Sequence, residues 1–126
     1  MLEIKIDKKM IMDLLNKFIK YTSSDFIRKI FNASTKISFK ENSIEIKVFL
    51  LKYYIKIHKI PFTLSGVYEF EHNLPIYLIN KKKLPQNILI DKNKIYIYIK
   101  ENFFTKSAYI DTFVFDNDKL IIKLKL

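Results

Sequence analysis

The apolar residues near the start of the chain recur at helical spacing. Across residues 7–32, apolar side chains follow one another at intervals of three and four residues, as Ile11, Leu15 and Phe18 illustrate, and this period is typical of an amphipathic helix. The polar residues from Thr22 to Ser24 interrupt the pattern and compete for backbone hydrogen bonds. This stretch is therefore predicted either as one long N-terminal helix with a kink or as a helix broken near these residues.

A short strand is predicted before this helix. Leu2, Ile4 and Ile6 alternate with polar residues, and such alternation is typical of a strand with one buried face. Asp7 follows, and its carboxylate can accept a hydrogen bond from an unpaired amide of the first helical turn. The helix is therefore predicted to begin beside Asp7.

The period changes to two after Lys36, and the apolar phase then slips by one residue. Apolar side chains occupy even positions from Ile44 to Leu50 and odd positions from Leu51 onwards. The two sets cannot face one core on a straight strand, so the slip predicts a β-bulge or a sharp bend in a long, strongly curved strand. Gly66 lies in the apolar phase of the next strand and predicts a second bend or a close backbone approach.

The remaining sequence predicts further strands and turns. Residues 76–79 are predicted as a short strand, and residues 80–87 as a polar loop interrupted by proline. Residues 88–99 predict one hairpin, and residues 103–126 predict a longer one with strands on both arms. This order predicts a single domain, residues 1–126, of the α+β class, in which the long helix packs on a strongly curved antiparallel β meander.

The charge of the chain favours anionic partners. Its 23 Lys and Arg residues against 13 Asp and Glu give a formal net charge of +10, which attracts polyanions and anionic membrane surfaces. Arg28 is the only arginine, however, and specific recognition of phosphate or guanine usually recruits arginine. The abundance of lysine, isoleucine and asparagine also fits AT-rich codon usage, in which case most lysines form a solvated surface.

The sequence predicts neither a disulfide framework nor a membrane span. It contains no cysteine, which excludes disulfides and thiolate metal sites. The N-terminus has no basic segment followed by an apolar core, so no secretory signal is predicted. No apolar run approaches the roughly 20 residues that cross a bilayer as a helix, and residues 48–51 are among the longest such runs. The cytoplasm is the expected compartment.

Few residues could support catalysis or bind a metal. His58 lies in the polar phase of a strand and is expected to be a surface residue. Glu69, Glu71 and His72 combine carboxylates with an imidazole, which suits a divalent cation, but they come from one segment and have no evident fourth ligand. Solvent-facing carboxylates before a turn are the favoured interpretation. We therefore predict no enzyme activity, no metal and no cofactor.

Nucleic-acid binding through a sheet face is an alternative. Tyrosines could stack on bases while lysines hold phosphates, although antiparallel sheets favour tyrosine and carry lysine on the outside in any case. A separate basic patch is formed by Lys81, Lys82 and Lys83. The interleaved residues are Tyr53, Tyr54, Tyr96, Tyr98 and Tyr109 with Lys52, Lys56, Lys94, Lys100 and Lys106.

Several segments of the second half follow one another in a distinctive order. They are residues 84–85, 88–90, 95–99 and 113–124, preceded by the helical stretch with Leu14 and Leu15 and by residues 37–39 and 44–46. This order resembles that of the tubular lipid-binding (TULIP) modules, in which a helix is cradled by a long, coiled antiparallel sheet. The resemblance implies that a lipid tail lies between the helix and the concave sheet.

The apolar surface exceeds what one helix can cover. Several strands are apolar on both faces, so the surplus must meet a ligand, a protein partner or a second copy of the chain. The first hypothesis is a non-enzymatic binding module for a lipid or another apolar ligand. A protein-interaction or assembly domain, as a homodimer or in a larger complex, is the alternative, and electrostatic binding to nucleic acid or an anionic membrane is a further one. The expected ligand-lining residues, each of which could instead belong to the core, are Phe18, Phe26, Phe62, Tyr68, Tyr96 and Phe113.

Overall fold

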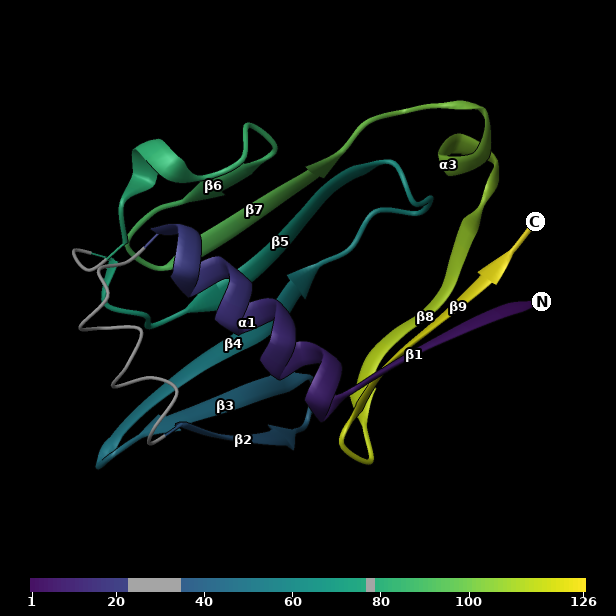
Figure 1. Ribbon diagram of the computed structural model, residues 1–126. Helices are drawn as coiled ribbons and strands as arrows, with labels where there is room; N and C mark the ends of the chain where they lie inside the picture. The colour runs from purple at the N-terminus through teal and green to yellow at the C-terminus, as the bar shows by residue number, and fades with distance from the viewer. Residues whose placement is uncertain (23–34, 77–78) are drawn as a thin grey trace.

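Figure 1 shows the computed structural model of the chain, which describes residues 1–22, 35–76 and 79–126. The strands form two separate antiparallel sheets, one of six strands in the order β2-β3-β4-β5-β7-β6 and one of three in the order β1-β9-β8. The α+β class and the antiparallel pairing are confirmed, but the single meander is wrong, because the first and last strands pair in a sheet of their own. The strands are β1 (Leu2–Asp7), β2 (Thr35–Lys40), β3 (Ser43–Val48), β4 (Leu51–Lys59), β5 (Gly66–His72), β6 (Ile88–Ile90), β7 (Lys94–Ile99), β8 (Tyr109–Asp116) and β9 (Lys119–Lys125).

Helix α1 (Lys8–Thr22) lies across one face of the six-stranded sheet (Figure 1). The backbone N–H of Met10 donates to Asp7 Oδ1 at 2.9 Å, so the predicted cap is confirmed. The long helix predicted for residues 7–32 is not supported, because α1 spans Lys8–Thr22 in the described part of the chain. The rest of that predicted helix, residues 23–32, lies outside the described residues.

The helix and both sheets share one hydrophobic core. Ile11 of α1, only 7% exposed, packs with Ile44 and Ile46 of β3 and with Phe115 of β8. Phe39 of β2 lies tilted against Phe115 with the ring centroids 5.3 Å apart. Full burial of one such side chain stabilises the fold by roughly 1.5–3 kcal/mol. Packing of this apolar face, more than helix propensity, therefore holds α1 in place.

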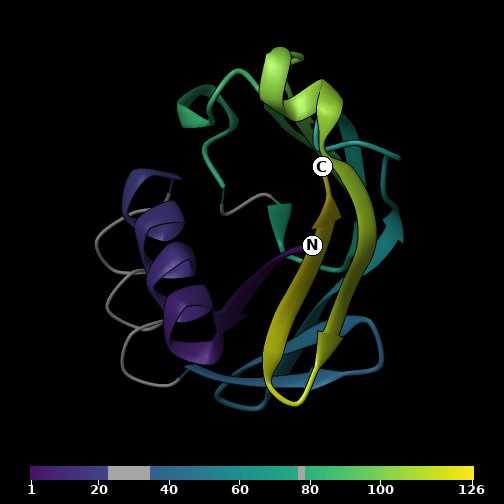
Figure 2. The ribbon, with the colours of Figure 1, turned by 90° about the vertical axis from the view of Figure 1, so that its right-hand side faces the viewer.

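The strand register separates an inner face from an outer face of the six-stranded sheet. The inner face looks toward α1 and contains Ile46, whereas the outer face looks away from the helix and contains the exposed neighbour Lys47. Successive side chains of a strand point to opposite sides, so the alternation in the sequence produces the two faces directly. Figure 2 shows the three-stranded sheet beside the six-stranded one, with α1 at the left of the view.

The predicted bend at residues 50–51 is wrong, and a tight hairpin lies there instead. Val48 of β3 pairs with Leu51 of β4, so only Phe49 and Leu50 form the turn. This pairing places the even positions of β3 and the odd positions of β4 on the same face, which accounts for the phase slip. The turn escaped prediction because it contains no Gly, Asn, Asp or Pro, and Phe49 adopts φ 55°, a region that usually requires Gly or Asn.

The last predicted hairpin is also corrected in its first arm. Helix α3 (Phe103–Ser107) replaces the start of the expected strand. Asn102 Oδ1 accepts a hydrogen bond from Thr105 N at 2.9 Å, and Asn102 N donates to Thr105 Oγ1 at 2.8 Å, so the two residues form a reciprocal cap. The remaining arms, β8 and β9, are confirmed as an antiparallel pair.

Gly66 lies where the sequence predicts a close backbone approach. Its φ of 123° is open to glycine alone among common residues, and a Cβ at this position would lie 3.0 Å from Pro61 Cβ. The predicted strand at residues 76–79 is not seen in its described residues, Ile76 and Ile79, and residues 77–78 lie outside the described part. The predicted loop that follows contains a short 3-10 helix, η2 (Lys81–Lys83).

Candidate functional site

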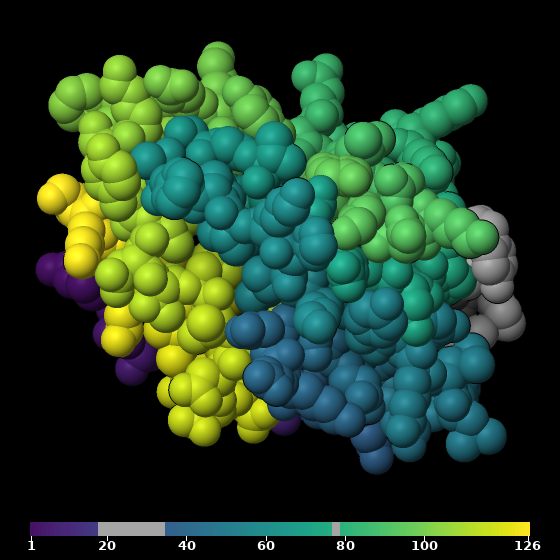
Figure 3. All heavy atoms as spheres, turned by 180° about the vertical axis from the view of Figure 1, so that it is seen from behind, coloured from purple at the N-terminus to yellow at the C-terminus, as the bar shows by residue number. Residues whose placement is uncertain are grey.

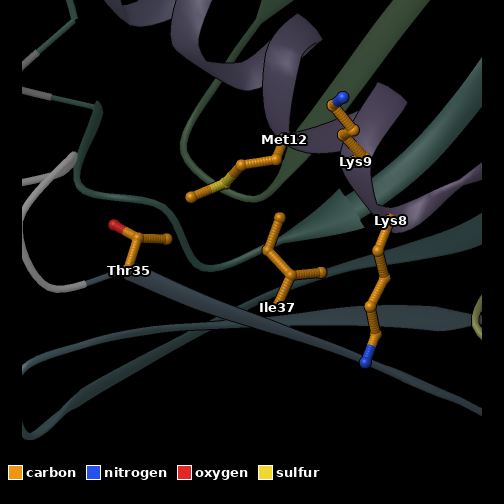
Figure 4. Close-up of a pocket in the computed structure, with 5 residues that line it drawn as sticks. All are labelled: Lys8, Lys9, Met12, Thr35 and Ile37. Carbon is orange, nitrogen blue, oxygen red and sulfur yellow. The ribbon is translucent and has the colours of Figure 1, made fainter.

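An open cleft lies between α1 and β2 (Figure 4). Its volume is about 240 Å³, somewhat below the roughly 300–1,000 Å³ of typical small-molecule sites. Met12 projects from the helix and Ile37 from the strand into the space between the two elements. The amino groups of Lys8 and Lys9 point away from that space, so their aliphatic stems line the cleft while their charges stand at its rim. The remaining lining residue is Thr35.

The cleft has firm apolar walls because both sides belong to the core. Met12 and Ile37 pack against the buried cluster around Ile11, on the first half of α1 and on the strand next to β3. Ile37 pairs with Ile46, whose side chain is 3% exposed. The walls are therefore preformed by the packing of the fold, and a ligand would not have to organise them.

The rim of the cleft carries positive charge. Lys8 Nζ lies 3.3 Å from Asp118 Oδ1, but both side chains are largely exposed and such pairs contribute little free energy. Among the residues described, Lys9 has no ion-pair partner. A cleft with an apolar interior and lysines at its rim suits a ligand with an apolar part and an anionic end.

Two of the predicted lining residues meet in the interior instead. The rings of Tyr68 on β5 and Phe113 on β8 lie with centroids 5.8 Å apart, where the two sheets approach each other. The Tyr68 hydroxyl donates to Leu64 O at 2.7 Å, and burial raises the pKa of this hydroxyl above its ordinary value. In the structure as it stands, both residues pack as part of the fold.

The other predicted lining residues are scattered. Phe62 is 90% exposed, in the connection between β4 and β5. Tyr96 lies on the outer face, where it pairs with Glu69 of β5 and Leu89 of β6. Phe26 and the side chain of Phe18 lie outside the described part of the structure. The described members of the predicted set therefore do not gather around one cavity.

Phe62 lies at the end of the molecule where the two sheets are joined. Its carbonyl accepts from Ile110 N at 2.7 Å, and Ala108 O accepts from Leu64 N at 3.0 Å. In Figure 3 the teal connection before β5 lies against the yellow-green region around α3, and the exposed aromatic side chains Phe62 and Phe103 belong to these two segments. This apolar end is separate from the cleft, because none of its residues lines it.

The predicted basic patch lies on a short, exposed element. Lys81, Lys82 and Lys83 form η2, and Asn80 caps it by accepting from Lys82 N at 3.1 Å. All three lysines are exposed. The patch is therefore available to an anionic partner, but no apolar side chain is buried in the element to accompany the charges.

The three candidate metal ligands are divided between the two faces of β5. His72 is buried on the inner face, where its Nδ1 accepts from Leu74 N at 2.9 Å. Its Nε2 therefore carries the proton and donates to Asp91 O at 2.8 Å. His72 ties two loops together, and within the described residues no group of side chains is suited to hold a metal ion.

Glu69 and Glu71 instead bind basic side chains on the outer face. The register of β4 against β5 shifts beside His58, and the two ring nitrogens lie 3.0 Å from Glu69 Oε2 and 3.1 Å from Glu71 Oε1. Lys94 Nζ lies 3.7 and 3.5 Å from the same two oxygens. These four ionisable side chains form a compact cluster across three strands.

The tyrosines of the outer face share it with carboxylates. Tyr96 pairs with Glu69, and Tyr54 pairs with Glu45 on the neighbouring strand. A base stacked on either ring would bring its phosphates close to a carboxylate, which repels them. The arrangement disfavours this face as a platform for nucleic acid.

One exposed feature was missed at the sequence level. Phe49 and Leu50 at the β3–β4 turn are 62% and 91% exposed, and Leu51 beside them is also exposed. The phase slip between Leu50 and Leu51 is the signal that could have located this turn, had it been interpreted as a change of strand and not as a bend.

Comparisons of the chain with protein-family models, curated proteins and solved structures find no match in any of the three. The resemblance to tubular lipid-binding modules therefore rests on the order of segments alone. In the parts that the structure describes, none of the helices is both long and apolar enough to cross a membrane.

Proposed function

We propose that the chain is a non-enzymatic binding module whose ligand is a small amphipathic anion, such as a fatty acid with its carboxylate end. The observation that supports this function is the cleft between α1 and β2, with Met12 and Ile37 inside and Lys8 and Lys9 at the rim. A cleft between helix and sheet is also where the resemblance to tubular lipid-binding modules would place a lipid tail. The charge of the rim distinguishes a fatty acid from a neutral apolar ligand.

Apolar contact supplies most of the expected affinity. Each methylene group removed from water contributes about 0.8 kcal/mol, whereas exposed ion pairs contribute about 0–1 kcal/mol. The volume of about 240 Å³ accommodates part of a long chain. Affinity should therefore increase with chain length until the cleft is filled, and it should change little with salt.

Titration with a fluorescent long-chain fatty acid tests the proposal. The substitution Met12→Trp places a bulky ring in the cleft and should weaken binding at least about tenfold, equivalent to about 1.4 kcal/mol. Met10→Trp is the matched control, because Met10 lies on the same helix, is exposed and does not line the cleft. Absence of binding by the unmodified chain, or equal loss in both variants, would contradict the proposal.

A further inference from the structure

The β3–β4 tip consists of Phe49, Leu50 and Leu51, and all three apolar side chains are exposed. In Figure 1 this tip projects at the lower left, beyond the other strands of the sheet. Exposed single apolar residues are common in proteins. Three consecutive ones at a projecting turn form a continuous apolar surface, and such surfaces mark sites of interaction.

The turn is not explained by folding alone. Phe49 adopts φ 55°, a conformation that carries a steric penalty for a residue with a bulky side chain. Asn-Gly or Asp-Gly would satisfy a two-residue turn without this penalty. Strain of this kind is concentrated at functional positions, so the aromatic side chain is expected to have a role outside the fold.

A row of lysines crosses the sheet directly behind the tip. Lys36 of β2 pairs with Lys47 of β3, and Lys47 pairs with Lys52 of β4, so three like charges lie side by side on the outer face. Like charges that face each other across strands are destabilising. All three side chains are exposed, and no ion pair joins them to any described residue.

The neighbouring carboxylate does not neutralise this lysine row. Glu45 lies two residues before Lys47 on the same outer face of β3, but its Oε2 is already 2.9 Å from Lys40 Nζ. The hydrogen bond from Lys40, with smaller contributions from Lys52 and Lys47, lowers the pKa of Glu45. A net positive charge therefore remains directly behind the apolar tip.

We propose that the β3–β4 tip docks on an anionic membrane surface, with Phe49 and Leu50 inserted at the boundary between headgroups and acyl chains and the lysine row bound to anionic lipid. Phe49 follows Lys47 by two residues, a distance of about 7 Å in an extended chain. This distance matches the depth of about 5–10 Å to which interfacial apolar side chains enter the bilayer. Flexible lysine side chains can follow the apolar tip and reach the lipid headgroups.

Docking on a membrane accounts for both the apolar β3–β4 tip and the lysine row behind it. Nucleic acid would satisfy the lysine row, yet it would leave Phe49 and Leu50 in water. A protein partner could cover the apolar tip, yet it gives no reason for three unneutralised lysines at the same end of the sheet. The tip lines no part of the cleft between α1 and β2, so this proposal stands whether or not the cleft holds a fatty acid.

Tryptophan fluorescence tests the insertion directly, because the chain contains no tryptophan. A Leu50→Trp variant is mixed with vesicles of phosphatidylcholine and phosphatidylserine, and its emission should shift to shorter wavelength and be quenched by quenchers attached to the acyl chains. The control is Phe62→Trp, at an equally exposed position distant from the tip, whose emission should not change. Unshifted Leu50→Trp emission with vesicle-bound protein would overturn the insertion.

Charge removal tests the lysine row. Each lysine near an anionic surface strengthens binding about fivefold, so replacing Lys36, Lys47 and Lys52 together by Gln should weaken sedimentation with phosphatidylserine vesicles by about a hundredfold. The matched control replaces the three exposed lysines of η2, Lys81–Lys83, by Gln and removes the same charge elsewhere.

The outcomes separate this proposal from its alternatives. Retained fatty-acid binding in the lysine variant, with lost vesicle binding, supports a membrane site distinct from the cleft. Equal loss in the two triple variants would show that the net charge alone attracts vesicles, and it would overturn the site. No binding of the unmodified chain to these vesicles at low salt, or a dimer in sedimentation equilibrium that Leu50→Trp abolishes, would overturn it as well.

Discussion

His72 shows how a single side chain can hold two loops. Its ring is 2% exposed, accepts from Leu74 N and donates to Asp91 O, so it joins the segment after β5 to the turn between β6 and β7. Both backbone groups would lose this partner without the imidazole, and partly buried polar groups without partners are costly. A histidine beside two glutamates has the composition of a metal site, but the sequence favoured solvent-facing carboxylates before a turn, and neither interpretation predicts a buried histidine.

His72→Ala is expected to lower the free energy of unfolding by about 2–4 kcal/mol, because a cavity and two unpaired polar groups remain. Urea denaturation followed by circular dichroism measures this change. His58→Ala on the outer face is the control and should cost no more than about 1 kcal/mol, since Lys94 Nζ stays 3.7 Å from Glu69 Oε2 and 3.5 Å from Glu71 Oε1. Equal effects of the two substitutions would contradict the role given to His72.

Tyr68 makes the folded chain less stable at alkaline pH. Because its hydroxyl has a raised pKa in the folded chain, the unfolded chain releases this proton at lower pH than the folded chain. Stability from this group is complete below the ordinary tyrosine pKa of about 10 and is lost as pH rises through the folded value. Unfolding free energies should therefore fall above about pH 10, and Tyr68→Phe should reduce this fall. If the unfolding free energy of Tyr68→Phe falls as steeply with pH as that of the unmodified chain, the role given to Tyr68 is contradicted.

At the scale of elements, the sequence predicts most strands because their apolar residues alternate. The strand before α1, the hairpin of β6 with β7 and the closing strand β9 are confirmed for this reason. The β3–β4 turn could not be recognised from its residue types, since Phe and Leu are not typical of turns. Helix α3 was missed because it spans only five residues and depends on a local cap at Asn102.

The strained turn gives a prediction at this scale. Phe49→Asn replaces a bulky residue at positive φ with one that tolerates it, so the free energy of unfolding should increase by about 1 kcal/mol. Vesicle binding through the tip should become weaker in the same variant. Thermal denaturation measures the first effect, with Leu50→Asn as the control that changes polarity without relieving a positive φ. If Phe49→Asn is less stable than the unmodified chain, the claim that the backbone at Phe49 is strained is contradicted.

At the scale of the whole molecule, the lining of the cleft between α1 and β2 depends on distances between elements, which the sequence does not show. The resemblance to tubular lipid-binding modules predicted a ligand between helix and sheet, and the large aromatic residues were natural candidates to line it. The cleft is instead lined by Met12, Ile37 and the stems of two lysines, because α1 crosses β2 at its N-terminal half. Which residues face each other across a helix and a strand follows from tertiary packing and not from periodicity.

The cleft and the β3–β4 tip give the molecule two surfaces of similar chemical composition. Each combines apolar side chains with lysines, at the rim of the cleft in one case and behind the turn in the other. Fatty acids and anionic lipids share this combination of an apolar chain with a negative end. A module that docks on a membrane and holds a single lipid-derived anion would use both surfaces.

Native mass spectrometry of the chain mixed with a long-chain fatty acid tests the binding function most directly. We expect one bound fatty acid per chain, in the unmodified protein and in Met10→Trp, and no adduct in Met12→Trp, whose ring fills the cleft. An unmodified chain that carries no adduct, or an adduct of equal abundance in Met12→Trp, would contradict the binding site between α1 and β2.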